Sequence, residues 1–226
     1  MSAVLDRPKT VKAKAQQSKK VKKQKVVEKV VLRNISWGTY ESLLEEQSEK
    51  SNVHFSYDDG ELEIMVESYK HSNYSRFLEY LVIELADIFE MDFIPAGSAT
   101  FKKEKETKGF EGDGSFYFKN VEKIRGKEKL DLSKDSPPEL VLEIDITHGS
   151  LSKFPIFAGL GIEEVWRFDG EKVLFYRLEN EDYKEVSESV CLKSVKSETV
   201  TELLFAAQEM KRFEWVKFIH KTIGKE

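Results

Sequence analysis

The sequence ELVLEIDITHGSLSKFPIFAGLGIEEVW, residues 139–166, predicts an apolar strand, a short polar turn, a helix and a second strand. The first strand carries two carboxylates, Glu143 and Asp145, and Lys153 follows a few residues later. In an alternating strand both carboxylates point to one face and the apolar side chains to the other. Burying a carboxylate is costly unless it is paired, hydrogen-bonded or bound to a cation. We therefore expect this face to be either a functional site or exposed to solvent.

Length and composition favour one compact domain in the cytoplasm. The chain has 226 residues, 40% hydrophobic and 12% aromatic, which is enough for a single core of ordinary size. Cys191 is the only cysteine, so a disulfide within the chain is excluded, and no Cys and His residues have the spacing of a zinc site. The sequence contains no apolar run near the ~18 residues of a membrane span and no signal-peptide pattern. We expect a cytoplasmic protein that has no membrane contact.

Charge is distributed unevenly along the chain. Residues 1–30 hold ten Lys or Arg and two acidic residues, a net charge of +8, so residues 31–226 carry −13 within a total of −5. The first segment is rich in Lys and Gln and poor in aromatic residues, which predicts a basic disordered tail ahead of one folded domain. The tail either binds nucleic-acid phosphates, acts as a solubilising extension, or lies on the acidic body.

The spacing of apolar residues predicts further elements around the central strand. Ser36 is the expected N-cap of a first helix, and residues 71–91 predict the longest helix of the chain. Two Asp-Gly pairs predict β-hairpins that turn at residues 59–60 and 169–170. Residues 199–224 have apolar positions at helical spacing, which predicts one or two closing helices.

Three residues in the strand region have the chemistry of a metal site. Asp113 begins the strand-like run EGDGSFYF, and Glu143 lies in the middle of the central strand. If these strands are neighbours, their carboxylates converge at a place where Mg²⁺ could bind, because Mg²⁺ takes oxygen ligands. A lysine beside them, Lys153, could orient or help to deprotonate an attacking water, or stabilise negative charge on a phosphate. The pattern indicates metal-assisted phosphodiester hydrolysis, and the alternative is a salt-bridged or solvent-facing glutamate.

Several runs of the sequence resemble the Uma-two family of restriction endonucleases, a bacterial branch of the PD-(D/E)XK nuclease superfamily. The resemblance covers roughly residues 31–211 and rests on GSATFKKE (97–104), EGDGSFYF (111–118), RGKEKLDLSKDSPPELVLEIDIT (125–147) and LSKFPIFAGLGIEEVWRFDG (151–170). It implies a restriction-endonuclease-like α/β fold, a mixed β-sheet flanked by helices in a single domain. It also implies DNA cleavage with Mg²⁺, for which Mn²⁺ can substitute, no small organic cofactor, and assembly as a homodimer.

The resemblance also assigns site residues. Asp113 matches the aspartate of the family's Pro-Asp pair, and Glu143 matches the acidic residue of the (D/E)XK strand. Asp145 occupies the usual lysine position, where it either adds a third metal-facing carboxylate or pairs with Lys153. In similar members the lysine lies on the following helix, which points to Lys153 as the catalytic lysine. With Ser152 as N-cap, Lys153 falls in the first turn of that helix and reaches back toward the strand.

Accessory residues are less sharply assigned. The superfamily often adds an acidic residue from the long helix or its approach, for which Glu67 and Glu79 are both candidates. His71 resembles a histidine common in the family, with either a role in the site or a local hydrogen bond. Gly112 stands where the family has proline, a change that affects the stiffness of the loop.

Two functions from different classes remain open at this stage. The intact set of Asp113, Glu143 and Lys153 favours a metal-dependent DNA endonuclease. The charge of −13 on residues 31–226 favours a catalytically inactive protein of nuclease fold that binds nucleic acid or a protein partner, because a DNA-binding surface should be locally basic. A basic tail that recruits DNA would reconcile the acidic body with the endonuclease hypothesis.

Overall fold

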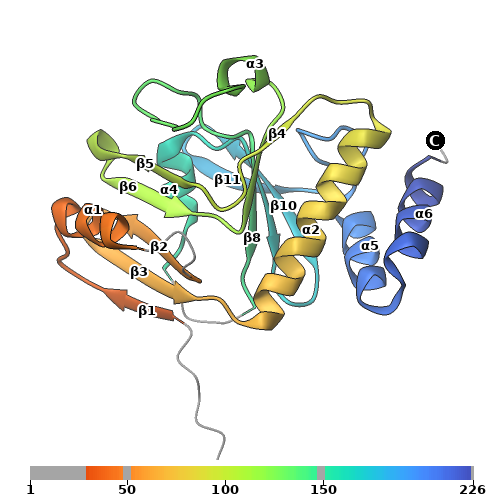
Figure 1. Cartoon of the computed structure of the whole chain (residues 1–226), viewed down its shortest axis with the longest axis horizontal. Helices are drawn as coiled ribbons and strands as arrows, with labels where there is room; N and C mark the ends of the chain where they lie inside the picture. Colours follow the sequence, from red (N-terminus) through yellow and green to blue (C-terminus); the bar gives the residue numbers. More distant parts are fainter. Residues whose placement is uncertain (1–28, 48–51, 147–150, 225–226) are drawn as a thin grey trace, which may run out of the picture.

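The computed structural model describes residues 29–47, 52–146 and 151–224 (Figure 1). The predicted basic tail, residues 1–30, lies outside this part of the chain except for Lys29 and Val30, which belong to the first strand. None of the helices in the described ranges combines the length and the apolar character that a membrane span requires.

The strands form two sheets that lie beside each other (Figure 1). The first sheet is antiparallel and has the order β1-β3-β2-β6-β5, built from β1 (Lys29–Leu32), β2 (Val53–Asp58), β3 (Glu61–Val66), β5 (Thr100–Lys103) and β6 (Lys108–Glu111). The second sheet has the order β11-β10-β9-β8-β7-β4, built from β4 (Ile94–Pro95), β7 (Gly114–Tyr117), β8 (Leu140–Ile144), β9 (Glu164–Phe168), β10 (Val173–Glu179) and β11 (Asp182–Val186).

Helices cover both sheets. They are α1 (Trp37–Glu46), α2 (Tyr69–Ile88), α3 (Val121–Ile124), α4 (Phe154–Leu160), α5 (Ser197–Glu209) and α6 (Arg212–Ile223), with a short 3₁₀ turn at Glu104–Glu106. Strands β8 and β9 run parallel and are joined through α4, whereas their other pairings are antiparallel. The expected α/β fold with a mixed sheet flanked by helices is therefore confirmed, and the separate antiparallel sheet is an addition that was not predicted.

Local sequence signals account for the ends of several elements. The Ser36 hydroxyl accepts a hydrogen bond from Thr39 N at 3.2 Å and caps α1, as predicted. Asp59 and Gly60 both have positive φ angles, 42° and 91°, which is the backbone of a two-residue hairpin turn between β2 and β3. The helix α4 begins one residue later than expected: its N-cap is Lys153, not Ser152.

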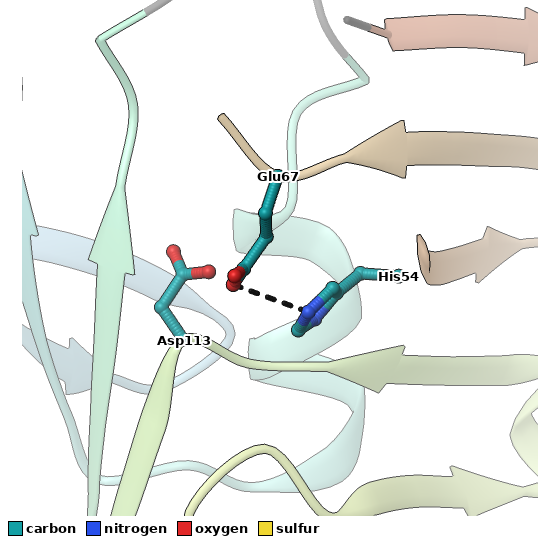
Figure 2. A group of neighbouring side chains, drawn as sticks. All are labelled: His54, Glu67 and Asp113. Carbon is teal, nitrogen blue, oxygen red and sulfur yellow. Dashed lines mark ion pairs between the residues drawn. The ribbon is translucent and has the colours of Figure 1, made fainter. Parts of the chain in front are cut away.

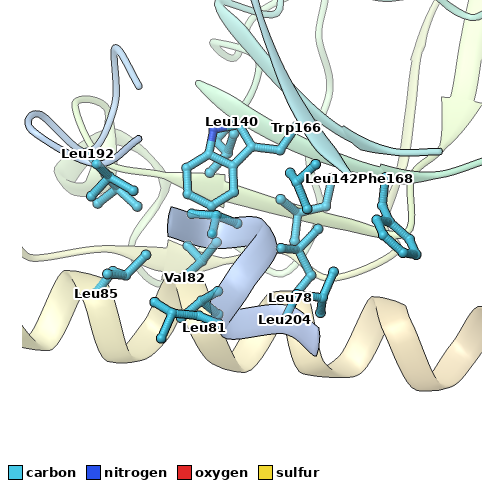
Figure 3. Close-up of a cluster of buried hydrophobic side chains, with 14 of the residues drawn as sticks. Leu78, Leu81, Val82, Leu85, Leu140, Leu142, Trp166, Phe168, Leu192 and Leu204 are labelled. Atoms are coloured by element: carbon cyan, nitrogen blue, oxygen red, sulfur yellow. The ribbon is translucent and has the colours of Figure 1, made fainter. Parts of the chain in front are cut away.

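The main core lies between α2 and the second sheet (Figure 3). One stripe of α2 is fully buried and faces side chains of β8 and β9, where the stripe is Leu78, Leu81, Val82 and Leu85 and the strands contribute Leu140, Leu142, Trp166 and Phe168. The closing helices α5 and α6 pack against α2. This spacing of three and four residues is the one that predicted the long helix from the sequence.

A second cluster covers the opposite side of β8. Val141 on β8 packs there with Phe157 of α4 and with Phe110 of β6. Because both faces of β8 are covered, all five of its residues are buried. Glu143 therefore has no solvent-facing side, so the alternative of a solvent-facing glutamate is excluded.

The packing of α2 predicts a large effect of Leu78→Ala. The substitution removes a fully buried side chain, so we expect the free energy of unfolding to fall by about 2–5 kcal/mol. Urea unfolding at pH 7 measures the change. The matched control is Leu32→Ala on the edge strand β1, where the leucine is 40% exposed and the loss should be about 0.5 kcal/mol. Equal losses at both positions would contradict the described core.

Candidate metal centre

The candidate site lies where the chain passes from the first sheet to the second. Strand β6 ends at Glu111 and β7 begins at Gly114, so Asp113 lies directly at the junction. Asp113 N donates to Leu142 O at 3.2 Å, and Asp113 Oδ2 accepts a hydrogen bond from Ile144 N at 2.6 Å. These two bonds to the β8 backbone hold the Asp113 carboxylate beside Glu143, which lies between Leu142 and Ile144.

Lys153 completes the group on the second sheet. Its Nζ lies 2.7 Å from Glu143 Oε1, and the two side chains are 6% and 7% exposed. The lysine reaches this position from the start of α4, because the N-cap residue of that helix faces back toward the end of β8. The structure thus brings together the three residues that the sequence singled out, Asp113, Glu143 and Lys153.

The first sheet contributes a histidine and a glutamate to the same junction (Figure 2). His54 on β2 has its Nε2 3.2 Å from Glu67 Oε1, and Glu67 directly follows β3. His71 lies between the two groups, with Nε2 3.4 Å from Asp113 Oδ2 and Nδ1 3.7 Å from Glu67 Oε1. His71 is buried, which favours a role in the site over a local surface hydrogen bond.

The two candidate accessory glutamates, Glu67 and Glu79, have different partners in the structure. Glu67 is part of a group with His54 and Asp113, in which one ligand atom from each residue lies within 4.8 Å of the others. Glu79 instead pairs with Arg76 on the same helix at 2.7 Å. Burial raises the pKa of the Glu79 carboxyl, and Arg76 opposes that rise. The negative charges of Asp113 and Glu67 add to the rise in the pKa of Glu79, so Glu79 also lies close to the site. Glu67 stays the proposed accessory acid because of its place in the group with His54 and Asp113.

Neither expected role of Asp145 agrees with its contacts. Its carboxylate accepts a hydrogen bond from Arg167 Nη2 at 2.5 Å and lies 3.4 Å from Lys29 Nζ, whereas Lys153 pairs with Glu143. Asp145 follows the last residue of β8, and Arg167 projects from the neighbouring β9. The expected pairing of Asp145 with Lys153 is wrong, and Asp145 lies outside the proposed catalytic group.

Several buried polar atoms of the site have no hydrogen-bond partner within the described residues. They are Asp113 Oδ1, Glu143 Oε2, Glu63 Oε1, His54 Nδ1 and both ring nitrogens of His71. Such atoms are rare in folded proteins, because each costs free energy unless water, an ion or a ligand contacts it. Carboxylate oxygens and imidazole nitrogens are metal ligands, so the free atoms fit a bound cation.

The pKa values of Asp113, Glu143 and Lys153 are shifted by burial and by the charges of their neighbours. Burial raises the pKa of Asp113, but the neighbouring His71 and Lys153 and the hydrogen bond from Ile144 hold it below its ordinary value. Burial raises the pKa of Glu143, and the negative charge of Asp113 adds to that rise while Lys153 opposes it. Burial lowers the pKa of Lys153, but Glu143 and Asp113 raise it far more, so the ammonium keeps its proton.

The two histidines also respond to the surrounding carboxylates. Burial lowers the pKa of His71, but Asp113 and Glu67 raise it above the ordinary value. Burial lowers the pKa of His54 as well, and Glu67 and Asp113 again outweigh that effect. The junction therefore has an excess of negative charge that favours nearby positive charge, whether a protonated imidazole or a metal cation.

Two residues of the junction escaped the reasoning from sequence. Glu63 is buried on β3, accepts a hydrogen bond from Leu151 N at 2.9 Å and raises the pKa of Lys153. Its signal was an acidic residue inside the apolar run ELEIMV, the same signal that marked Glu143. His54 had no comparable signal, because its role depends on how the first sheet docks against Asp113.

Comparison with known proteins gives one family match and a distant structural neighbour. The family model Uma2, described as "Putative restriction endonuclease", matches residues 37–207. A solved structure described as "a putative nuclease belonging to DUF820" from Anabaena variabilis is 16% identical in sequence. That match covers 78% of this chain and 97% of the other, with a TM-score of 0.45. No curated protein matches the chain.

Asp145→Asn removes the anion shared by Arg167 and Lys29, and we expect a loss of about 1–3 kcal/mol in unfolding free energy at pH 7. Burial raises the pKa of Asp145, but Arg167 and Lys29 hold it below its ordinary value. Its contribution is therefore complete above the unfolded-state pKa near ~4 and is lost as the pH falls through the lower folded-state pKa. The difference between wild type and Asp145→Asn should shrink below about pH 4.

Urea unfolding between about pH 7 and 3 measures this dependence. Asp92→Asn is the matched control, because Asp92 is exposed and pairs with Arg125 on the surface. Its cost should stay below about 1 kcal/mol. A deficit in Asp145→Asn that does not change with pH would show that the ion pairs contribute nothing to stability.

Proposed function

Because the chain belongs to the Uma2 family of restriction endonucleases, we propose that it is a metal-dependent DNA endonuclease that hydrolyses phosphodiester bonds. In this proposal Asp113 and Glu143 hold Mg²⁺, or Mn²⁺ in its place, and Lys153 acts on the scissile phosphate. One observation carries the proposal: beside a buried lysine, two buried carboxylates each have an oxygen that lacks a hydrogen-bond partner in the part of the chain that the structure describes.

The charges of the group support a divalent cation. Asp113, which precedes β7, lies beside Glu143 on β8, and Lys153 pairs directly with Glu143. Buried anions are stable only with nearby positive charge and full hydrogen bonding. Asp113 Oδ1 and Glu143 Oε2 lack such partners among the described residues. Both are hard oxygen ligands of the kind that Mg²⁺ prefers.

The ion pair of Lys153 supports one of the two roles that the sequence left open. A lysine with a raised pKa keeps its proton at neutral pH, so it is a poor base for an attacking water. Its ammonium instead orients Glu143 and stabilises negative charge that develops on the phosphate. When bound, the cation supplies an activated water and neutralises part of the phosphate charge.

His71 and the β8 backbone act as positioning groups in this proposal. Ile144 N binds one oxygen of Asp113, and His71 Nε2 lies 3.4 Å from the same oxygen. These contacts hold the carboxylate so that its other oxygen stays free to bind a cation. A fixed ligand orientation reduces the entropy lost on metal binding and keeps the substrate geometry precise.

The substrate class follows from the family and from the distribution of charge. The family description names an endonuclease, and residues 31–226 carry a net charge of −13, which repels nucleic acid at long range. The net charge of +8 on residues 1–30 supplies the opposite sign on the same chain. We propose that these residues recruit DNA to the site through phosphate contacts.

Glu143→Gln tests the cleavage proposal. The substitution keeps the size of the side chain but removes the charge that Lys153 and the cation share. We expect nicking of supercoiled plasmid in Mg²⁺ to fall by roughly 100-fold or more and calorimetric binding of Mg²⁺ to be lost. Lys153→Met should reduce nicking similarly while Mg²⁺ still binds, because the lysine acts on the phosphate.

The matched control is Glu163→Gln, which removes a glutamate paired with a lysine, Lys119, on the surface. Its nicking rate and Mg²⁺ binding should equal those of wild type. If wild-type protein neither binds Mg²⁺ or Mn²⁺ nor nicks plasmid, the endonuclease proposal fails. A catalytically inactive protein of nuclease fold that binds nucleic acid or a protein partner would then account for the family match.

Deletion of residues 1–28 tests the recruitment of DNA. The deletion removes nine Lys or Arg and keeps the strand β1. Because each phosphate contact releases counterions, the slope of log affinity against log salt should become shallower in the truncated protein. Fluorescence anisotropy with labelled duplex DNA between about 50 and 200 mM salt measures the slope. An unchanged slope would show that the basic tail does not recruit DNA.

A further inference from the structure

Three side chains from separate elements meet on the side of Asp113 that faces the first sheet (Figure 2). His54 comes from β2, Glu67 follows β3, and Asp113 precedes β7. One ligand atom from each lies within 4.8 Å of the other two, and Glu143 is not part of this group. The exposed fractions of the side chains are 11%, 18% and 0%.

An ordinary ion pair does not account for this group. His54 Nε2 and Glu67 Oε1, 3.2 Å apart, would satisfy each other as a pair without Asp113. Asp113 adds a second negative charge beside them. His71 Nε2 and Ile144 N contact its Oδ2, but its buried Oδ1 has no hydrogen-bond partner within the described residues. In Figure 2 one oxygen of the Asp113 carboxylate faces the Glu67 carboxylate, and the His54 ring lies on the other side of Glu67. A cation between the three groups would remove both problems.

The types of ligand atom in this group indicate which cation would bind there. An imidazole nitrogen binds first-row transition metals well, whereas Mg²⁺ strongly prefers oxygen ligands and water. Two carboxylates with one imidazole suit a metal such as Mn²⁺, which accepts both oxygen and nitrogen ligands. The Asp113 and Glu143 pair of the proposed function offers oxygen alone, so the two positions differ in selectivity.

We propose that His54, Glu67 and Asp113 form a second cation site, selective for a transition metal such as Mn²⁺ over Mg²⁺. The site deepens the proposed function because it shares Asp113 with the catalytic group, and it regulates that group by fixing the carboxylate from the side of the first sheet. Metal binding at these three residues does not itself require that the protein cleave DNA.

Electron spin echo envelope modulation of the Mn²⁺-loaded full-length protein tests the proposal directly, because it detects nitrogen bonded to Mn²⁺. Wild type should show the imidazole nitrogen signal, and His54→Gln should lose it. Mn²⁺ affinity by calorimetry should fall roughly tenfold or more in His54→Gln, while Mg²⁺ affinity stays within about twofold. The matched control, His220→Gln, changes a 54% exposed histidine and should keep both the signal and the affinity.

Two further variants keep the result interpretable. Glu67→Gln should also weaken Mn²⁺ binding, and circular dichroism of each variant establishes that the fold is intact. If His54→Gln keeps the nitrogen signal, or if only His71→Gln loses it, the assignment to His54 is overturned. A wild-type protein that binds Mn²⁺ without a nitrogen signal overturns it as well.

Plasmid nicking in the same samples separates this inference from the proposed function. A nitrogen signal that depends on His54 in a protein that does not nick DNA would support the second site and reject the endonuclease. Nicking that depends on Glu143, without any nitrogen signal, would support the endonuclease and reject the second site. Loss of Glu143 should leave the nitrogen signal in place, because Glu143 lies outside the group.

Discussion

The attachment of Asp113 to the backbone of β8 is the contact on which the arrangement of the junction depends. Two hydrogen bonds, from Asp113 N to Leu142 O and from Ile144 N to Asp113 Oδ2, fix one carboxylate at the point where the chain leaves the first sheet. Backbone groups cannot change rotamer, so this position is more rigid than a contact between two side chains. The other charged residues of the junction lie around it. Glu143 comes from β8, Lys153 from the start of α4, Glu67 and His54 from the first sheet, and Glu63 and His71 lie beside them.

The cost of this arrangement is buried charge. A strand covered on both faces normally reads as continuous apolar sequence, and β8 does so except at Glu143. An ion pair such as Glu143 with Lys153 gives little net stability in a protein interior, because desolvation offsets the attraction. Apolar residues at such positions often serve a fold as well as a buried ion pair does. The buried charges, and the oxygens of Asp113 and Glu143 that lack a partner within the described residues, therefore suit the proposed binding of a cation.

Reasoning from sequence succeeded where short-range patterns control structure. The helical stripe of α2, the hairpin turn at Asp59 and Gly60, and the strand-helix-strand order of β8, α4 and β9 each follow from residues close together in the chain. It failed where distant segments meet. A pairing with Lys153 was one of the two alternatives for Asp145, but Arg167 on β9 and Lys29 on β1 are its partners in the structure. His54 was overlooked for the same reason, since nothing in its own strand shows that it faces Asp113.

The contacts of Asp145 have a consequence for the connection between the two sheets. Lys29 belongs to the first sheet, Arg167 to the second, and one carboxylate holds both. Asp145 thus links the two sheets through ion pairs, close to the proposed metal ligand Glu143. Dissolved salt weakens the attraction within an ion pair, and it does so more when the charged groups are exposed to solvent. Salt should therefore weaken the contact with Arg167, which is 32% exposed, more than the contact with Lys29, which is 7% exposed.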